Sequence, residues 1–246
     1  MKLAYLPLVF LYFFLALPQA RAERFIKQQD LFLKSAKVLQ CPSEIYDNTL
    51  LDIYELHEQY DFELEALGHR SDDTVFDAAI QIIESKVRDL DFDSYITMVG
   101  AILAMKLGAV KTVQTDEVSL HGLPTETIIQ PLNCQQATFA HFVFSAEIDG
   151  GETISHVIID ELIFNQMDFH NQVAAIIHIG AFWLILKDPR SRVVDPVSIR
   201  RLNALILSKE IRSYDRRMFR LFLNSIGVHD RTLDDFFNWE RYRMHP

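Results

Sequence analysis

Hydrophobic residues recur along this chain with two different periods, and the two periods separate the stretches expected to be helical from those expected to be strands. Apolar positions at helical spacing predict helices over residues 50–60, 75–90 and 94–106. Gly108 stands where a left-handed residue would end the third helix. The caps expected for the first two helices are polar: Asn48 or Thr49, and Asp72 or Asp73.

The middle of the chain has the composition of strands. Residues 137–146 and 153–160 are rich in β-prone residues, and they flank Asp149-Gly150-Gly151, which favours a tight hairpin. If Asp149 and Gly150 are the two turn residues, His141 and His156 fall on one face of the ladder. A slip of one residue would undo that alignment. A short strand is also predicted before Pro42, which would end it.

Residues 153–187 form the unit around which the rest of the chain is organised. The strand of the hairpin leads into a long helix, for which Asp168 is a good cap. Apolar and small residues run nearly all round this helix, so we expect it to be buried on most sides. His178 lies in its middle, and its surroundings decide whether the chain carries catalytic chemistry.

Two helical stretches follow this central unit. Pro196 can open the first, over residues 196–211, with Arg200 on its outer side, and the second lies near residues 214–225. No repeat or low-complexity linker separates the elements. We therefore predict one α+β domain over residues 23–246, with helices packed on a small antiparallel sheet and a central His-bearing helix.

The amino-terminal pattern differs from all of this. Lys2 precedes an apolar run over residues 3–17, followed by the small-x-small triplet Ala20-Arg21-Ala22. This is typical of a secretory signal peptide over residues 1–22, cleaved after Ala22. The run is shorter than the roughly 20 residues needed to span a bilayer. We expect an exported protein, periplasmic or secreted, without stable membrane insertion after cleavage; an uncleaved anchor is the alternative.

Composition narrows the choice of partner. The chain has 24 basic and 34 acidic residues, and residues 1–22 contain two of the basic ones and none of the acidic ones, so the mature net charge is −12. Such a protein is a poor candidate for binding nucleic acid or anionic membrane. We expect an unknown protein or a cell-envelope ligand as its partner. With 49% hydrophobic residues and 18 phenylalanines, the chain can build a large core.

The chain has two cysteines, Cys41 and Cys134. In an oxidising compartment such a pair often forms a disulfide, which would close a loop of 93 residues. Two buried, reduced thiols are the alternative. Two cysteines without further ligands make no metal site.

The central helix lacks the residues of a zinc peptidase. A zinc-peptidase helix carries His-Glu-x-x-His, in which two histidines bind the metal and the glutamate activates water. Here the corresponding positions hold His178, Ile179 and Phe182. We therefore predict no cofactor and no metal, and interpret His178 as a core residue hydrogen-bonded to backbone. A metal site that combines His178 with His141 or His156 is the alternative.

Other candidate motifs are weaker. The stretch His57-Glu58-Gln59-Tyr60-Asp61 imitates a zinc motif, but its polar surroundings favour a solvated helix face. No Gly-x-Ser-x-Gly nucleophile elbow is present. A group of basic residues indicates a solvated surface that pairs with nearby acids: Arg212, Arg216, Arg217 and Arg220.

Several stretches, in this order, resemble a group of exported, largely uncharacterised proteins of predatory bacteria. The stretches are Val38-Leu-Gln-Cys41, Leu50-Leu-Asp-Ile-Tyr-Glu55, Leu123-Pro124, Cys134-Gln135, the strand at residues 154–160, Gln172-Val-Ala-Ala-Ile-Ile-His178 and Asp195-Pro-Val-Ser-Ile-Arg-Arg-Leu-Asn203. The similarity covers about residues 36–208, and its motifs are short. It implies a zincin-like fold, that is, a reduced zinc-peptidase architecture without a complete ligand set.

The resemblance also points to individual residues. His178, Asp195 and Arg200 match the group's polar positions, whereas Ile179 replaces its glutamate and Pro196 its serine. An aspartate and an arginine near His178 could satisfy the buried imidazole. The implied function is a binding or structural protein of zincin-like lineage without catalytic zinc, and no catalytic residue is assigned. The alternative is an exported hydrolase acting on peptides or cell-wall glycan.

Overall fold

A computed structural model describes residues 35–41, 48–66, 74–113, 133–146, 152–187 and 196–228. The signal peptide predicted for residues 1–22 lies outside these ranges, as do Asp72, Asp73 and Asp195.

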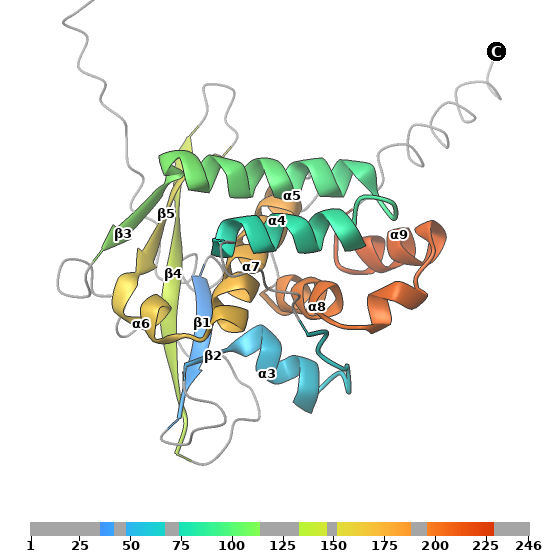
Figure 1. Ribbon diagram of the computed structural model, residues 1–246. Helices are drawn as coiled ribbons and strands as arrows, with labels where there is room; N and C mark the ends of the chain where they lie inside the picture. The colour runs from blue at the N-terminus through green and yellow to red at the C-terminus, as the bar shows by residue number, and fades with distance from the viewer. Residues whose placement is uncertain are drawn as a thin grey trace, which may run out of the picture.

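A five-stranded sheet forms one side of the molecule (Figure 1). Its strands are β1 (Ser35–Gln40), β2 (Thr49–Leu50), β3 (Val110–Val113), β4 (Gln135–Ala146) and β5 (Glu152–Asp160). Their order is β2-β1-β4-β5-β3. Three of the four pairings are antiparallel, as the sequence predicted for the whole sheet. The fourth differs from that prediction, because β3 lies parallel to β5.

The hairpin register agrees with a turn at Asp149-Gly150 over its inner part. His141 pairs with Ile158, and Val143 pairs with the position of His156. Beyond Val143 the register shifts by one residue at a bulge, so the outer part of the ladder differs from that expectation. The bulge lies past the two histidines, which therefore keep positions on one face.

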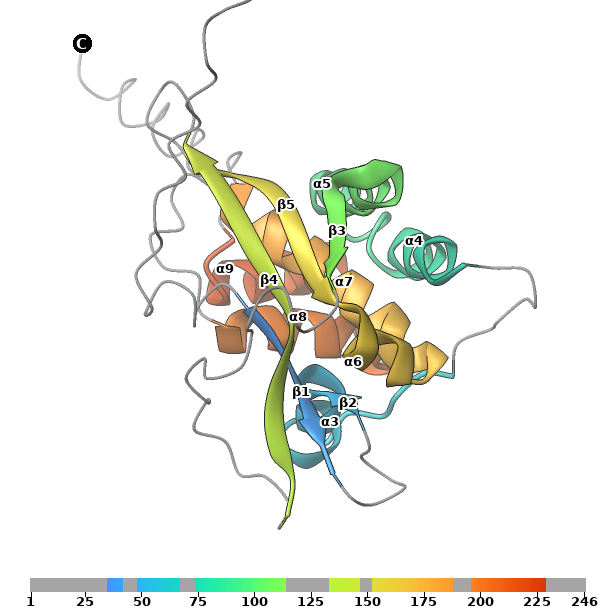
Figure 2. The same cartoon turned by 90° about the vertical axis from the view of Figure 1, so that its left-hand side faces the viewer.

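The helices are α3 (Leu51–Glu58), α4 (Val75–Lys86), α5 (Phe92–Ala104), α6 (Glu161–Gln166), α7 (Phe169–Lys187), α8 (Pro196–Leu207) and α9 (Arg216–Ser225). A π turn, Met105–Ala109, continues α5 to Gly108, whose φ of 114° ends it as predicted. Figure 2 shows the sheet in front with α7, α8 and α9 behind it. The prediction of helices packed on a small sheet in an α+β fold is confirmed.

Several of the predicted helix boundaries change, among them the start of α5, which is Phe92 after the cap Asp91 rather than Ser94. Thr74, rather than Asp72 or Asp73, caps α4 by accepting a hydrogen bond from the Asp77 backbone N–H. Neither Asn48 nor Thr49 caps α3, because Thr49 and Leu50 form strand β2 and the Leu50 N–H donates to Asn171 Oδ1 at 2.7 Å. The helix opened by Pro196 ends at Leu207 rather than residue 211, since Ser208 bridges to Leu64.

Helix α7 is the centre of the core. Its cap is Asp168, as predicted, which accepts from the Asn171 N–H at 2.7 Å. Ten consecutive positions, residues 173–182, are buried, since α4, α5 and α8 surround the helix. Phe182 stacks on Phe142 of β4 with ring centroids 3.8 Å apart, which joins the helix to the sheet. None of the described helices combines the length and the apolar character needed to cross a membrane.

The two cysteines form a disulfide, which decides between the alternatives left open by the sequence. Cys41 comes directly after β1, and Cys134 comes directly before β4. Both are next to the ladder pair Gln40–Gln135, so the bond extends that register by one position. Both residues are buried with Leu39, Leu51 and Tyr54 in a small second cluster. The bond fixes the end of β1 to the start of β4.

Candidate functional site

Three apolar helices bring polar side chains to one place in the core. Asp52 and Glu55 lie one turn apart on α3, Arg200 and Asn203 lie one turn apart on α8, and His178 comes from α7. We call these five residues the polar cluster. Each of them is at most 3% exposed, so their polar groups are out of water and need partners within the protein.

His178 is held by a carboxylate. Its Nδ1 lies 2.6 Å from Asp52 Oδ2, the same oxygen that accepts a hydrogen bond from Asn203 Nδ2 at 2.7 Å. Asn203 Nδ2 also donates to the Ala174 carbonyl of α7 at 3.0 Å. Asp52 thus joins α3 to both α7 and α8, and the partner of the imidazole is a carboxylate rather than the backbone group expected from the sequence.

Arg200 forms the second half of the cluster. Its Nε donates to Glu55 Oε2 at 2.7 Å, and both side chains are buried. The sequence placed Arg200 on the outer side of its helix, which is wrong because α3 packs against that side of α8. Of the polar residues matched by the resemblance, His178 and Arg200 therefore both lie in the core, but they bind different carboxylates.

One feature of the cluster, the His178–Asp52 pair, is typical of acid–base sites. A histidine paired through Nδ1 with a buried aspartate is the arrangement that orients the base in nucleophilic hydrolases. Buried acceptors are also present: Asp52 Oδ1 and Asn203 Oδ1 have no hydrogen-bond partner within the described ranges. No three His, Cys, Asp or Glu side chains in those ranges lie close enough together to hold a metal ion.

Tyr60, just beyond α3, borders the cluster. Burial, reinforced by the negative charge of Glu55, raises the pKa of Tyr60 to about 12, and the nearby Arg200 opposes the rise. Its buried hydroxyl has no hydrogen-bond partner in the part of the chain that the structure describes. The tyrosine therefore stays neutral in the folded protein well above the pH at which an exposed tyrosine ionises.

This difference predicts an alkaline effect on stability. The unfolded chain releases the Tyr60 proton near its ordinary pKa of 10, whereas the folded chain keeps it to about 12, so stability falls as pH rises through this interval. Tyr60→Phe lacks the effect. From pH 9 to pH 11, the free energy of unfolding of the variant should rise by about 1 kcal/mol relative to that of wild type, after allowance for the partial exposure of Tyr60. Urea denaturation at the two pH values measures this difference. If the difference in free energy of unfolding between the two proteins is the same at pH 9 and pH 11, the raised pKa of Tyr60 is contradicted.

The residues around His178 explain why it is not arranged as in a zinc peptidase. Ile179 and Phe182 occupy the positions of the missing glutamate and second histidine, and both are buried in the core. Phe182 is committed to its stack on Phe142. The place where a zinc peptidase helix would present a second ligand is therefore part of the packing between α7 and the sheet.

The other candidate residues predicted from the sequence do not belong to the polar cluster. His57 and Glu58 are exposed at the end of α3, as predicted for a solvated helix face. His141 is buried on β4, and the register puts His156 on the same face of the sheet. Asp195 lies outside the described residues.

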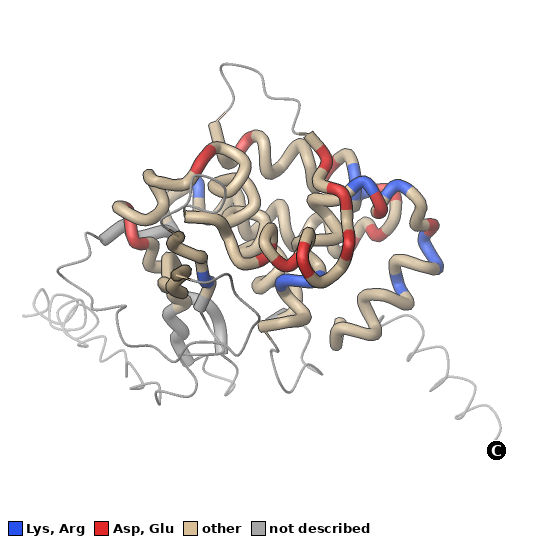
Figure 3. The backbone as a smooth tube through the Cα atoms, turned by 90° about the horizontal axis from the view of Figure 1, so that it is seen from below, with Lys and Arg blue, Asp and Glu red and all other residues tan. Residues whose placement is uncertain are grey.

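The basic residues of the last helices lie among acidic segments (Figure 3). Arg212 forms an ion pair with Glu65, which also pairs with Lys86 at 3.1 Å, and Arg220 lies 3.5 Å from Asp91. Arg216 donates to the Asp89 carbonyl. The predicted pairing with acids is therefore confirmed for Arg212 and Arg220, whereas Arg216 binds a backbone carbonyl.

Sequence reasoning missed Asp52, Glu55 and Asn203 as members of the site. A signal was present, because two acids one turn apart interrupt the apolar run Leu51-Asp-Ile-Tyr-Glu-Leu56. Protein families, curated proteins and solved structures contain no match to this chain. The site is therefore interpreted from its own geometry.

Proposed function

We propose that this chain is an exported, periplasmic or secreted protein of zincin-like lineage that acts by binding a protein or envelope ligand, or as a structural component, without catalytic zinc. The observation that carries the proposal is the use made of the central helix. His178 is engaged by Asp52, and the next ligand position is filled by Phe182, stacked on Phe142. The polar cluster then serves to orient α3, α7 and α8 relative to one another.

Export is supported by two independent features of the chain. One is the signal-peptide pattern of residues 1–22. The other is the disulfide between Cys41 and Cys134, since such bonds persist in oxidising compartments. An acidic protein that is stabilised in this way fits the cell envelope or the medium.

Metal content tests the proposal most directly. We expect the purified protein to contain well below one zinc per chain after dialysis, by elemental analysis, because the described residues bring no three potential ligands together and Phe182 fills the position of the second histidine. Stoichiometric zinc that survives dialysis, and is lost in His178→Gln but not in His170→Gln, would overturn the proposal. His170 is a suitable control since it lies on the same helix and is only partly buried.

The role of His178 can be separated from catalysis by its effect on folding. His178→Ala leaves a polar cavity and removes a partner of the buried Asp52, so we expect a loss of about 2–3 kcal/mol in stability. Thermal and urea denaturation measure the loss. A structural role predicts a lower melting temperature with unchanged ligand binding.

The alternative, an exported hydrolase of peptides or cell-wall glycan, is favoured by one observation, the buried Asp52–His178 pair. Its test is hydrolysis of peptide and peptidoglycan substrates by wild type and by His178→Gln. Activity that is abolished in the variant at an unchanged melting temperature would establish the alternative and reject the non-catalytic proposal. Equal rates of hydrolysis by wild type and His178→Gln would reject a hydrolase that depends on His178.

A further inference from the structure

Helix α5 has an apolar face that none of the described elements covers. Its inward side, with Met98, Ala101 and Ile102, is buried and packs mainly on α7. The outward side carries a second apolar row, the α5 stripe: Phe92, Ile96, Gly100, Leu103 and Leu107. A surface helix normally carries polar residues on this side.

The exposure of the stripe is unusually high. Phe92 is 61% exposed, Ile96 51%, Leu103 43% and Leu107 86%. Half of the large, exposed hydrophobic residues in the described ranges therefore lie on α5 and the π turn that continues it, the others being Leu162, Val197, Met218 and Leu221. Contiguous apolar surface of this kind marks an interaction site more often than it occurs by chance.

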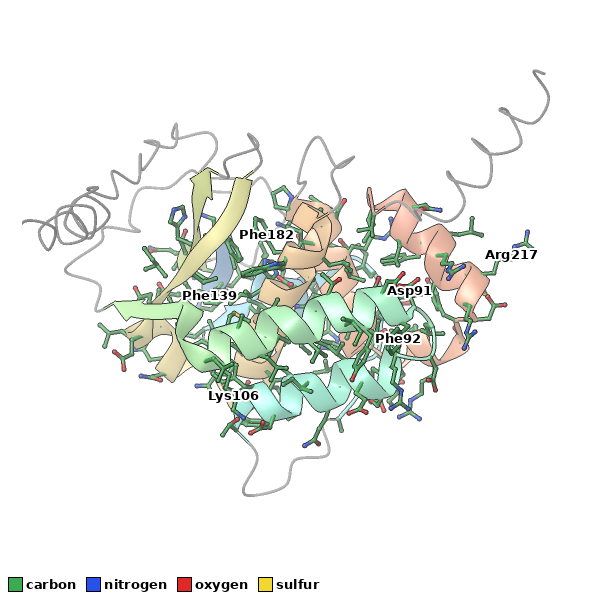
Figure 4. The ribbon with its side chains drawn as sticks, turned by 90° about the horizontal axis from the view of Figure 1, so that it is seen from above. Asp91, Phe92, Lys106, Phe139, Phe182 and Arg217 are labelled. Atoms are coloured by element: carbon green, nitrogen blue, oxygen red, sulfur yellow. A yellow bond between two sulfur atoms is a disulfide. The ribbon has the colours of Figure 1, made fainter. Side chains whose placement is uncertain are left out.

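The position of α5 makes the stripe accessible to a large partner. The helix runs along the upper edge of the described structure (Figure 1). Seen from above, it lies in front of the core with Phe92 and Lys106 near its two ends, and none of the other described elements crosses it (Figure 4). The fifteen steps from Phe92 to Leu107, at about 1.5 Å each, give the stripe a length of about 22 Å.

The stripe has the symmetry that pairing with its own copy requires. Bulky residues stand four and eight positions before Gly100 and three and seven positions after it. In an antiparallel pair of α5 helices, Ile96 of one copy lies level with Leu103 of the other, and Phe92 with Leu107. Gly100 then falls at the crossing point, where a Cβ built on it meets no atom within 4 Å, so a second helix can approach closely.

The charges favour the same arrangement. Residues 94–105 contain no charged side chain, and Asp93 and Lys106 bracket this segment at its two ends. An antiparallel pair brings Asp93 of one copy to the same end as Lys106 of the other, which also pairs with Asp77 of its own chain, whereas a parallel pair brings like charges together. The antiparallel helix dipoles add to this preference.

From these features we infer that the protein forms a symmetric dimer through the α5 stripe, with the two helices antiparallel and crossing at Gly100. Such an interface is isologous, since each copy contributes the same surface. One helix offers less area than the roughly 800 Å² per partner of a standard interface, so the dissociation constant should be on the order of micromolar.

The first experiment measures association. Sedimentation analysis of the purified protein, with its disulfide intact, should show a monomer–dimer equilibrium between about 1 and 100 µM, the range set by a micromolar constant. Ile96→Lys or Leu103→Lys should raise the dissociation constant at least about tenfold, because each buries two lysines in the symmetric interface. Leu162→Lys, which replaces an exposed leucine of α6, is the matched control and should leave it unchanged.

Substitution of Gly100 separates the interface from folding. Gly100→Leu should raise the melting temperature of the monomer, because helix propensity improves and the side chain enters open space. The same change should weaken the dimer at least about tenfold, since it holds the two helices apart. A more stable protein that dimerises less is an outcome that a misfolded variant cannot produce.

Cysteine cross-linking tests the orientation. Mixed single variants Ile96→Cys and Leu103→Cys should join to each other in preference to forming 96–96 or 103–103 bonds. The inference is overturned by a protein that stays monomeric at 100 µM, by a dimer indifferent to Ile96→Lys and Gly100→Leu, or by preferred 96–96 bonds. A monomer that dimerises after residues 229–246 are removed would instead identify that segment of the same chain as the occupant.

Discussion

Replacement of Arg200 by methionine should lower the free energy of unfolding by about 3–5 kcal/mol. The change removes the Nε donor 2.7 Å from Glu55 and leaves a carboxylate that is 1% exposed without its ion-pair partner. Water hardly reaches that carboxylate, so the cost of burying its charge is offset less well once Arg200 is gone. Urea denaturation of the oxidised protein at neutral pH provides the measurement.

Two further variants show that the loss comes from the uncompensated charge. In Glu55→Leu/Arg200→Met the cluster loses both charges at once, and we expect most of the stability to return, because paired apolar residues of similar volume pack well. Arg201→Met alters the neighbouring arginine, which is exposed above the Phe222 ring, and should cost less than about 1 kcal/mol. If the double variant is as unstable as the single one, shape rather than charge explains the effect.

Removal of the disulfide should lower the free energy of unfolding by an amount comparable to that expected for the Arg200 variant. A bond that closes a loop of 93 residues is worth about 4–5 kcal/mol in the chain-entropy treatment. Cys41→Ala/Cys134→Ala should therefore unfold at a much lower urea concentration than wild type. Its two alanines leave only a small gap in the cluster formed with Leu39, Leu51 and Tyr54.

A reducing agent supplies the control for this prediction. It should lower the stability of wild type towards that of the double alanine variant and leave the variant unaffected. If reduction destabilises both proteins equally, the agent acts elsewhere and the bond contributes little. If neither reduction nor substitution matters, β1 and β4 are held together by their ladder and packing without help from the sulfurs.

The local parts of the fold follow from the sequence because their causes are local. Asp168 was recognised as a cap and Gly108 as a left-handed end because each acts on its own neighbours. The inner hairpin register is the one expected for a turn at Asp149-Gly150, but the bulge after Val143 was not expected. A bulge depends on how the two strands twist against the core, and no residue pattern announced it.

The candidate site was only half predictable, since its contacts join distant parts of the chain. His178 stood out in an apolar helix, and a buried imidazole requires a polar partner. That partner is Asp52, 126 residues earlier, and helical spacing could not say that α3 would lie against α7. Arg200 was placed outside for the same reason, because only the packing of α3 on α8 makes its side of the helix an interior one.

Strand β1, the first of the described strands, lies inside the sheet, with β2 on one side and β4 on the other. Its larger partner begins only at Gln135, about a hundred residues later, so β1 has to wait for a long loop to close before its hydrogen bonds form. Topologies of such high contact order fold slowly. Under the proposed export, this delay would help to keep the chain extended during translocation, because the β1–β4 ladder cannot form before Gln135 and the residues after it are present.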